Sequence, residues 1–220
     1  MTNTIDGSIR AAAVRWPSAV LAVLLVGLIG CGPSAGTEVQ VSIPAAVRAE
    51  ATTGRLFLAL APSDDPEPRI AAYNSARQRD GRVPYFAIDL DQLEAGAAAI
   101  IDRSAIGYPY PSLDDLPPGD YWVQAIVNLY TRFERADGHT VWAHMDQWEG
   151  QRWAFSPGNL YSKPMKVRLG SGSRVSLELT ETVPPIEVPA DDRWVKRIKI
   201  QSEILSKWWG HPIYLGATVL

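Results

Sequence analysis

The sequence has little cysteine and no cluster of basic residues, and each shortage excludes a class of protein. Its one cysteine, Cys31, allows no intrachain disulfide, so the hydrophobic core must hold the fold even in an oxidising compartment. The 21 Lys and Arg residues are dispersed among 24 Asp and Glu residues, which argues against nucleic acid as a partner. The chain has no internal repeat and no complete catalytic motif.

Apolar residues and turn formers are abundant instead. Apolar residues make up 46% of the chain and include eight Trp and eight Tyr, enough for one core of ordinary size. Seventeen Pro and seventeen Gly favour many turns and short elements. This composition predicts a mainly β fold.

The first 31 residues have the layout of a secretory signal. Arg10 and Arg15 precede a short apolar run over 19–29, and small residues and then Cys31 follow it. The alternative is a membrane anchor that is not cleaved. Against that alternative, the run is shorter than the roughly 20 residues that span a bilayer, and Pro17 opens it.

The tetrapeptide Leu28-Ile29-Gly30-Cys31 resembles the lipobox of bacterial lipoproteins. The resemblance implies that 1–30 is a signal peptide and that Cys31 receives a lipid on its thiol and new amino end. Gly32 is not acidic, which in such lipoproteins implies transport to the outer membrane of a two-membrane cell. We therefore expect the membrane to be a partner and the protein to be lipid-anchored in the cell envelope.

Residues 31–50 are predicted to be a tether and 51–183 a domain of short strands. Apolar or alternating segments bounded by Gly and Pro predict the strands, which are 55–61, 84–90, 97–102, 121–133, 140–143, 165–169 and 175–179. The polar segment 62–82 is predicted to be a long exposed loop. Short strands at this spacing predict an immunoglobulin-like antiparallel sandwich.

The Pro-rich segment 184–191 is predicted to be a stiff linker. Beyond it, apolar spacing over 194–209 fits a helix, whereas Ile198 and Ile200 on either side of a lysine fit a strand equally well. Periodicity leaves both open. Trp208-Trp209 is expected to pack between the sandwich and whatever follows it.

Residues 192–220 resemble the first two antiparallel strands of esterases of the α/β-hydrolase class. Trp194 to Leu205 corresponds to the polar strand, and Gly210 to Leu220 to the turn and the apolar strand. Two further segments, 116–121 and 157–164, resemble the sandwich-like N-terminal region of some bacterial members.

The esterase resemblance implies that the chain is the N-terminal part of a secreted, lipid-anchored serine ester hydrolase, truncated at Leu220. The sandwich would be an accessory domain or position an ester substrate. Esterases of this class need a Gly-x-Ser-x-Gly elbow, which is absent; 170–173 reads Gly-Ser-Gly-Ser and has the wrong spacing. We therefore assign no catalytic residue and no cofactor, and we expect this chain to be inactive alone.

The candidate ligand-binding residues are aromatic: Trp142, Trp148, Trp153 and Tyr161. In a segment rich in loops, such side chains can form a platform for sugar rings or another flat ligand. Core packing or an interdomain contact is the other interpretation. The platform supports an alternative function, a non-enzymatic envelope lipoprotein that binds glycan or a partner protein.

A metal site is not expected. His139 and His144 lie five residues apart, so on a strand they would point to opposite faces, which is poor geometry for two ligands. The loop carboxylates Asp64-Asp65 and Asp114-Asp115 lack the dense alternate spacing of a calcium loop.

Overall fold

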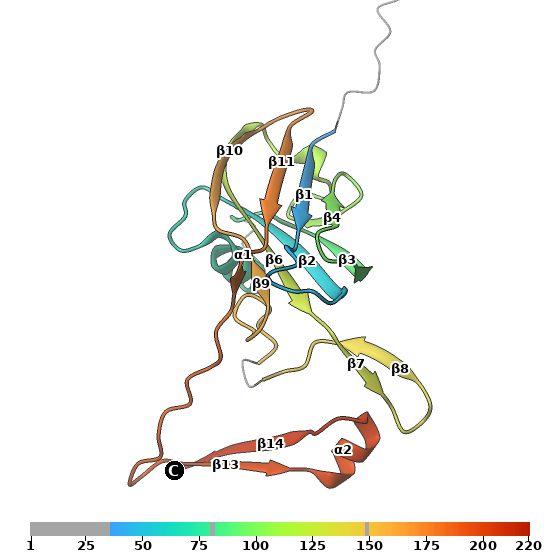
Figure 1. Cartoon of the computed structure of the whole chain (residues 1–220). Coiled ribbons are helices and arrows are strands. Elements are labelled where there is room, and N and C mark those ends of the chain that lie inside the picture. The colour runs from blue at the N-terminus through green and yellow to red at the C-terminus, as the bar shows by residue number, and fades with distance from the viewer. Residues whose placement is uncertain (1–35, 80–81, 148–149) are drawn as a thin grey trace, which may run out of the picture. The chain divides into compact units, whose positions relative to one another are not determined.

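The computed structural model describes residues 36–79, 82–147 and 150–220 (Figure 1). The chain divides into two units, 1–33 and 34–220, and every described residue belongs to the second. The predicted signal peptide and Cys31 lie outside the described residues. Within the described part of the chain, the helices are all too short or too polar to cross a membrane.

The fold is mainly β, as the composition predicts, and two sheets form its body. The smaller sheet has the order β11–β1–β4, with bounds Arg174–Glu178, Glu38–Ser42 and Ala98–Ile101. The larger has the order β12–β9–β6–β2–β3–β5, with β10 also paired to β6. Its bounds are β2 Thr52–Ala61, β3 Tyr85–Leu93, β5 Ile106–Tyr108, β6 Gly119–Leu129, β9 Leu160–Tyr161, β10 Met165–Leu169 and β12 Glu181–Thr182.

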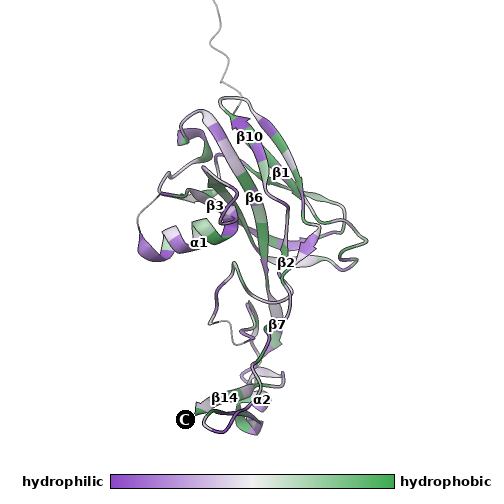
Figure 2. Cartoon of the chain, turned by 90° about the vertical axis from the view of Figure 1, so that its left-hand side faces the viewer, coloured by the Kyte–Doolittle hydropathy of each residue, from purple (hydrophilic) through white to green (hydrophobic). Residues whose placement is uncertain are grey.

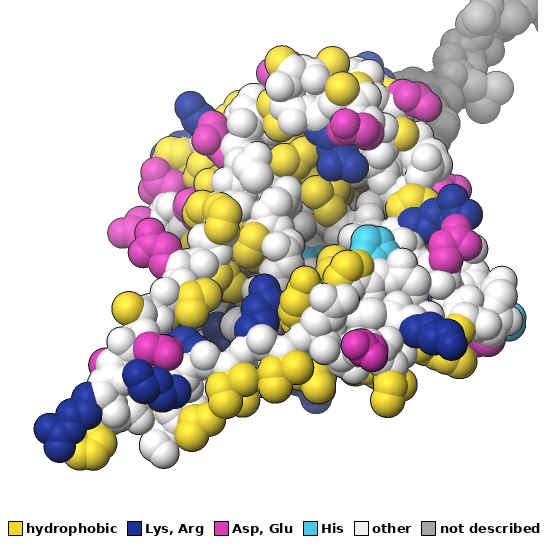
Figure 3. Space-filling model, turned by 60° about the horizontal axis from the view of Figure 1, so that its bottom comes forward, with side chains coloured by type: hydrophobic (Ala, Val, Ile, Leu, Met, Phe, Trp, Pro, Cys, Tyr) yellow, Lys and Arg dark blue, Asp and Glu magenta, His cyan; other side chains and the backbone are white. Residues whose placement is uncertain are grey.

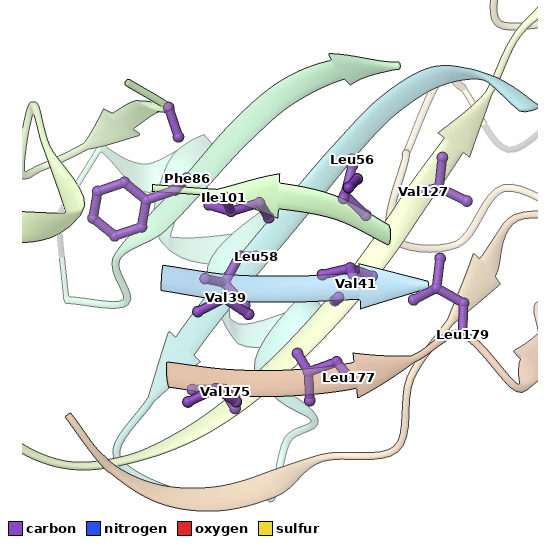
Figure 4. Packing of buried hydrophobic residues seen from close by; sticks show 14 of the residues in the cluster. Val39, Val41, Leu56, Leu58, Phe86, Ile101, Val127, Val175, Leu177 and Leu179 are labelled. Atoms are coloured by element: carbon purple, nitrogen blue, oxygen red, sulfur yellow. The ribbon is translucent and has the colours of Figure 1, made fainter. Parts of the chain in front are cut away.

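The main core lies between these two sheets (Figure 4). Side chains of β1, β4 and β11 pack against those of β2, β3 and β6, and nine of them are labelled in the figure, together with Leu179 just after β11. Strand β6 shows the predicted alternation: Val123, Ala125 and Val127 are fully buried in this core, whereas Ile126 is buried on the opposite face. Figure 2 shows hydrophobic residues along the central stretch of β6.

The opposite face of the larger sheet is covered by helix α1, Pro68–Gln78, which contacts β2 and β6. The predicted exposed loop over 62–82 is therefore wrong. Ala72 is fully buried in a small cluster with Ala59 and Ala61 of β2. Because these side chains are small, the helix can lie close to the sheet. The helix packs there although it has no wide apolar stripe.

Strand β1 lies inside the predicted tether, so the tether prediction is wrong for this part of 31–50. Val39, Val41 and Ile43 are at most 2% exposed, because they face the main core. Strand β1 pairs with β11 in parallel and with β4 in antiparallel orientation. One pair of strands thus departs from the predicted antiparallel arrangement.

One other strand prediction needs correction. The predicted strand 121–133 is two strands, since β6 ends at Leu129 and β7, Thr131–Glu134, pairs with β8, Thr140–Ala143. The predicted turn at Asp137-Gly138 joins β7 to β8, and Gly138 has φ +85°. Strands β10 and β11 are both present but belong to different sheets, so the turn over 170–173 carries the chain between sheets.

The C-terminal segment contains both predicted elements. Strand β13, Lys196–Gln201, is followed by helix α2, Glu203–Trp209, and strand β14, Tyr214–Val219, pairs with β13 in antiparallel orientation. The Ser202 side chain caps the helix by accepting a hydrogen bond from the Leu205 amide. The segment preceding β13 has no regular structure over 183–192. A short 3-10 turn, Leu113–Asp115, completes the set of described elements.

Candidate functional site

The C-terminal segment carries most of the exposed apolar surface. Ten of the sixteen exposed large hydrophobic side chains in the described part of the chain lie within 194–220. Helix α2 has no buried residue, and no residue of β13 or β14 is buried. Exposed apolar surface concentrated in this way marks a contact region rather than an ordinary solvated surface.

The strand register sorts the side chains of β13 and β14 into two faces. Lys196 pairs with Val219, Ile198 with Ala217 and Ile200 with Leu215, so these six residues share one face, which is apolar except for Lys196 at its outer end. We call it the open face. Its four larger apolar side chains are 43–59% exposed.

The other face of the β13–β14 pair is polar. Arg197 and Lys199 alternate with the isoleucines of β13, and the Lys199 ammonium lies 4.6 Å from the centre of the Tyr214 ring. The Arg197 Nη1 group donates to the main-chain oxygens of Pro189 and Ala190, at 2.9 and 3.0 Å. These bonds hold the linker against this face.

A groove of about 930 Å³ lies beside the polar face, and we call it the junction groove. Its walls come from β7, β8 and the segment after β8, from the linker, and from the C-terminal strands; they include Phe133, His144, Ile186, Arg197, Lys199 and Tyr214. Figure 3 shows a hollow in this region with basic and apolar side chains along it. The groove combines apolar walls with two cations.

The tip of the β7–β8 hairpin contacts the end of α2. The Ala136 amide donates to the Trp208 carbonyl at 2.7 Å, and the Phe133 ring lies edge-on to Trp209 with 5.6 Å between ring centres. Arg135 lies over both tryptophan rings, at 5.4 and 5.9 Å. Trp208-Trp209 therefore contact this hairpin, which belongs to neither main sheet. That they pack between the sandwich and a following segment stays a prediction.

Gly210 makes the contact with the hairpin close. Its φ is +65°, and an added Cβ would lie only 2.5 Å from the Glu134 carbonyl oxygen. Glycine is needed here both for the left-handed backbone and for the space.

Of the predicted aromatic residues, the structure brings Trp153 and Tyr161 together. Trp153 stacks on Phe57, with 4.3 Å between ring centres, and packs with Tyr161 on the outer face of the larger sheet. Trp142 is 42% exposed on β8, outside that cluster, and Trp148 lies outside the described residues. One face of the Trp153 ring is thus covered by another ring.

A buried polar network beneath α1 was not predicted from the sequence. Gln124, fully buried on β6, accepts a hydrogen bond from the Arg69 amide at 2.9 Å. Its Nε2 group donates to the Glu67 carboxylate at 2.7 Å and to the Ser162 carbonyl at 2.9 Å. Arg69 also pairs with Glu67 at 2.9 Å.

The charges of this network are balanced internally. Burial raises the pKa of Glu67, but the hydrogen bonds from Gln124 and Arg69 and the guanidinium charge outweigh it, so the pKa lies below its ordinary value. The signal available in the sequence was Gln124 itself, a polar residue next to Ile126 on one face of the predicted strand 121–133. Because its groups are paired with one another, the network anchors α1 and presents no reactive group.

The described residues contain no group of three or more His, Cys, Asp or Glu side chains that could hold a metal ion. His139 lies by the hairpin turn, with Nδ1 3.3 Å from Asp137, and His144 has Nδ1 3.4 Å from the Leu129 carbonyl oxygen. The two histidines therefore have separate partners.

No protein-family model, no curated protein and no solved structure matches this chain. Its function is therefore inferred from the open face, the junction groove and the sequence motifs.

Proposed function

We propose that this chain is the N-terminal, non-catalytic part of a secreted, lipid-anchored serine ester hydrolase, whose catalytic domain begins at β13. The open face carries the proposal. A two-stranded sheet is at best marginally stable in water, and an apolar sheet face normally packs against another layer. A catalytic domain built onto β13 and β14 would supply that layer.

The two-sheet domain would act as the accessory domain, and we propose that it is immunoglobulin-like. The Tyr121 hydroxyl donates to the Pro117 carbonyl at 2.7 Å, four residues upstream at the start of β6. A tyrosine bonded back to the preceding corner in this manner is a hallmark of immunoglobulin-type sandwiches. In the proposed protein, the linker and the β7–β8 hairpin would position the catalytic domain.

The proposed chemistry is acyl transfer to an activated serine followed by hydrolysis of the acyl-enzyme. The serine, acid and histidine would come from sequence beyond Leu220, because this chain has no nucleophile elbow. The lipid on Cys31 would hold the enzyme at the envelope membrane. Cys31→Ser should move the protein from the membrane fraction to the soluble fraction of the cell, and unchanged fractionation would contradict the anchor.

The decisive experiment is to read the source DNA past the codon for Leu220. We expect an open frame that continues to a Gly-x-Ser-x-Gly elbow. The longer protein should hydrolyse p-nitrophenyl acyl esters, and changing the elbow serine to alanine should abolish this. A stop codon directly after Leu220 would overturn the proposal.

Matched variants test whether the catalytic domain covers the open face. Ile200→Asp should destabilise the longer protein, because it would bury a charge, but leave the two-sheet domain of the 220-residue chain unchanged, since Ile200 is 59% exposed there. Ile106→Asp is the control, because Ile106 is 73% exposed on β5. Equal effects of Ile200→Asp on both chain lengths would show that the face stays open.

The second candidate is a non-enzymatic envelope lipoprotein that binds glycan or a partner protein. The exposed Trp142 favours it, because an aromatic ring accessible on a hairpin can stack on a sugar. Soluble polysaccharides titrated against tryptophan fluorescence should then perturb the emission, and Trp142→Ala should remove the response. No response across a broad panel would count against glycan binding.

A further inference from the structure

We infer that the junction groove binds an amphipathic carboxylate, an apolar acyl chain with one anionic end. This inference goes beyond the proposed hydrolase, because it needs only residues of this chain and no catalytic group. The volume of the junction groove, about 930 Å³, lies within the range of roughly 300–1,000 Å³ that is usual for small-molecule sites.

The apolar part of the ligand has matching walls. Phe133, Ile186, Val188 and Ile213 line the groove, together with prolines of the linker and of the turn before β14. These residues come from three separate segments of the chain, so the groove forms only where the hairpin, the linker and the C-terminal strands meet. An acyl chain lying along these walls would be removed from water, which favours binding in proportion to its length.

The anionic end of the ligand has matching charge. Arg197 and Lys199 lie two residues apart on the same side of β13, and both line the groove. Among the described residues of the lining, Asp146 is the one carboxylate. In the described part of the chain, Arg197 makes no ion pair, and its guanidinium is held in place by main-chain oxygens. A positioned guanidinium of this kind favours a carboxylate, which it can bind through two parallel hydrogen bonds.

The test is a binding titration of the purified 220-residue chain with hexanoate, octanoate and decanoate, monitored by calorimetry below their micellar concentrations. We expect saturable binding that tightens about fourfold for each added methylene group. Decanol has the same chain without the charge, and it should bind at least tenfold more weakly than decanoate.

Variants locate the site. Lys199→Gln and Arg197→Gln should each weaken decanoate binding several-fold and leave decanol binding unchanged, whereas Lys207→Gln on α2, outside the groove lining, should change neither. Lys199→Gln keeps the test valid if Arg197→Gln disturbs the linker, because the bonds to the linker carbonyls come from Arg197. Equal binding of decanol and decanoate, or unchanged decanoate affinity in the Lys199 variant, would overturn the inference.

A failed hydrolase proposal would leave this result unaffected. The titration measures binding by the present chain, whereas the hydrolase proposal depends on sequence beyond Leu220.

Discussion

The buried network beneath α1 makes the sharpest stability prediction. Gln124→Leu keeps the approximate size of the side chain but removes its acceptor and both of its donors. The Arg69 amide and the Ser162 carbonyl would each lose a partner in a place that water does not reach, because both residues are at most 8% exposed. The third bond of Gln124, to the Glu67 carboxylate, would also be lost. The Glu67 side chain is 35% exposed, so water can take the place of that donor.

The magnitude follows from the two buried groups. Leaving a buried donor or acceptor unpaired costs about 1–3 kcal/mol, so two such groups should cost about 2–6 kcal/mol. The Glu67 bond adds little, because water can replace it. For a domain of this size, each kcal/mol lowers the melting temperature by about 2–4 °C. We therefore expect Gln124→Leu to melt roughly 10 °C below the wild type.

Urea unfolding followed by circular dichroism measures the effect directly. We expect a lower midpoint with an unchanged slope, which is the sign of lost stability without a change in the unfolded state. Gln40→Leu is the matched control, because Gln40 is exposed on the outer side of β1 and its side chain donates to the partly exposed Glu38. It should stay within about 0.5 kcal/mol of the wild type. If Gln124→Leu also stays within that margin, the network contributes nothing and the reasoning fails.

Three further predictions concern single positions. Gly54→Ala should cost more than about 2 kcal/mol in urea unfolding, because the new methyl group would lie 2.3 Å from a main-chain oxygen of β6, whereas Gly170→Ala, with no atom nearer than 3.8 Å, should be close to neutral. Glu67→Gln removes a carboxylate whose pKa lies below its ordinary 4.5. The wild type should therefore have a higher free energy of unfolding than the variant, with the full difference present above about pH 5 and lost as the pH drops through the lowered pKa. A difference that grows in acid would contradict this. Gly210→Ala should separate α2 from the β7–β8 hairpin and change the fluorescence of Trp208-Trp209, while leaving the melting of the two-sheet domain unchanged.

The sequence predicts the individual strands well, because alternation and turn residues are local signals. Strands β2, β3, β4, β8, β10 and β11 all overlap their predicted ranges. Helix α1 was missed for a physical reason: its buried side is made of small or polar residues such as Ala72 and Ser75, which leave no apolar stripe in the sequence. Pro68 at its first turn was the signal available, because proline is favoured at that position.

The pairing of the strands could not be predicted in the same way. Nothing local shows that Val39 and Val175 are partners in a parallel pair, because they are separated by nearly the whole domain. The junction groove is hidden for the same reason, since Phe133, Ile186 and Lys199 belong to three segments that meet only in the fold. The aromatic residues were visible in the sequence, but their spacing did not reveal that Trp153 stacks on Phe57.

The distribution of burial leads to a prediction about local stability. The pairs of β2 with β6 lie at the centre of the larger sheet and include fully buried residues such as Leu58 and Ala125, so their amides should exchange hydrogen only through global unfolding. Strands β13 and β14 have the same kind of ladder but no buried residue, so their amides should exchange through local opening at rates close to those of an unfolded peptide. Hydrogen exchange with mass spectrometry separates the two cases.

A layer packed on the open face, or an acyl ligand in the junction groove, should slow exchange in β13 and β14 selectively. Each would bind the folded β13–β14 pair and not the locally opened one. Slow exchange in β13 and β14 of the isolated chain would mean that the pair is stable without a covering layer, and the chief reason for placing a further domain there would be lost.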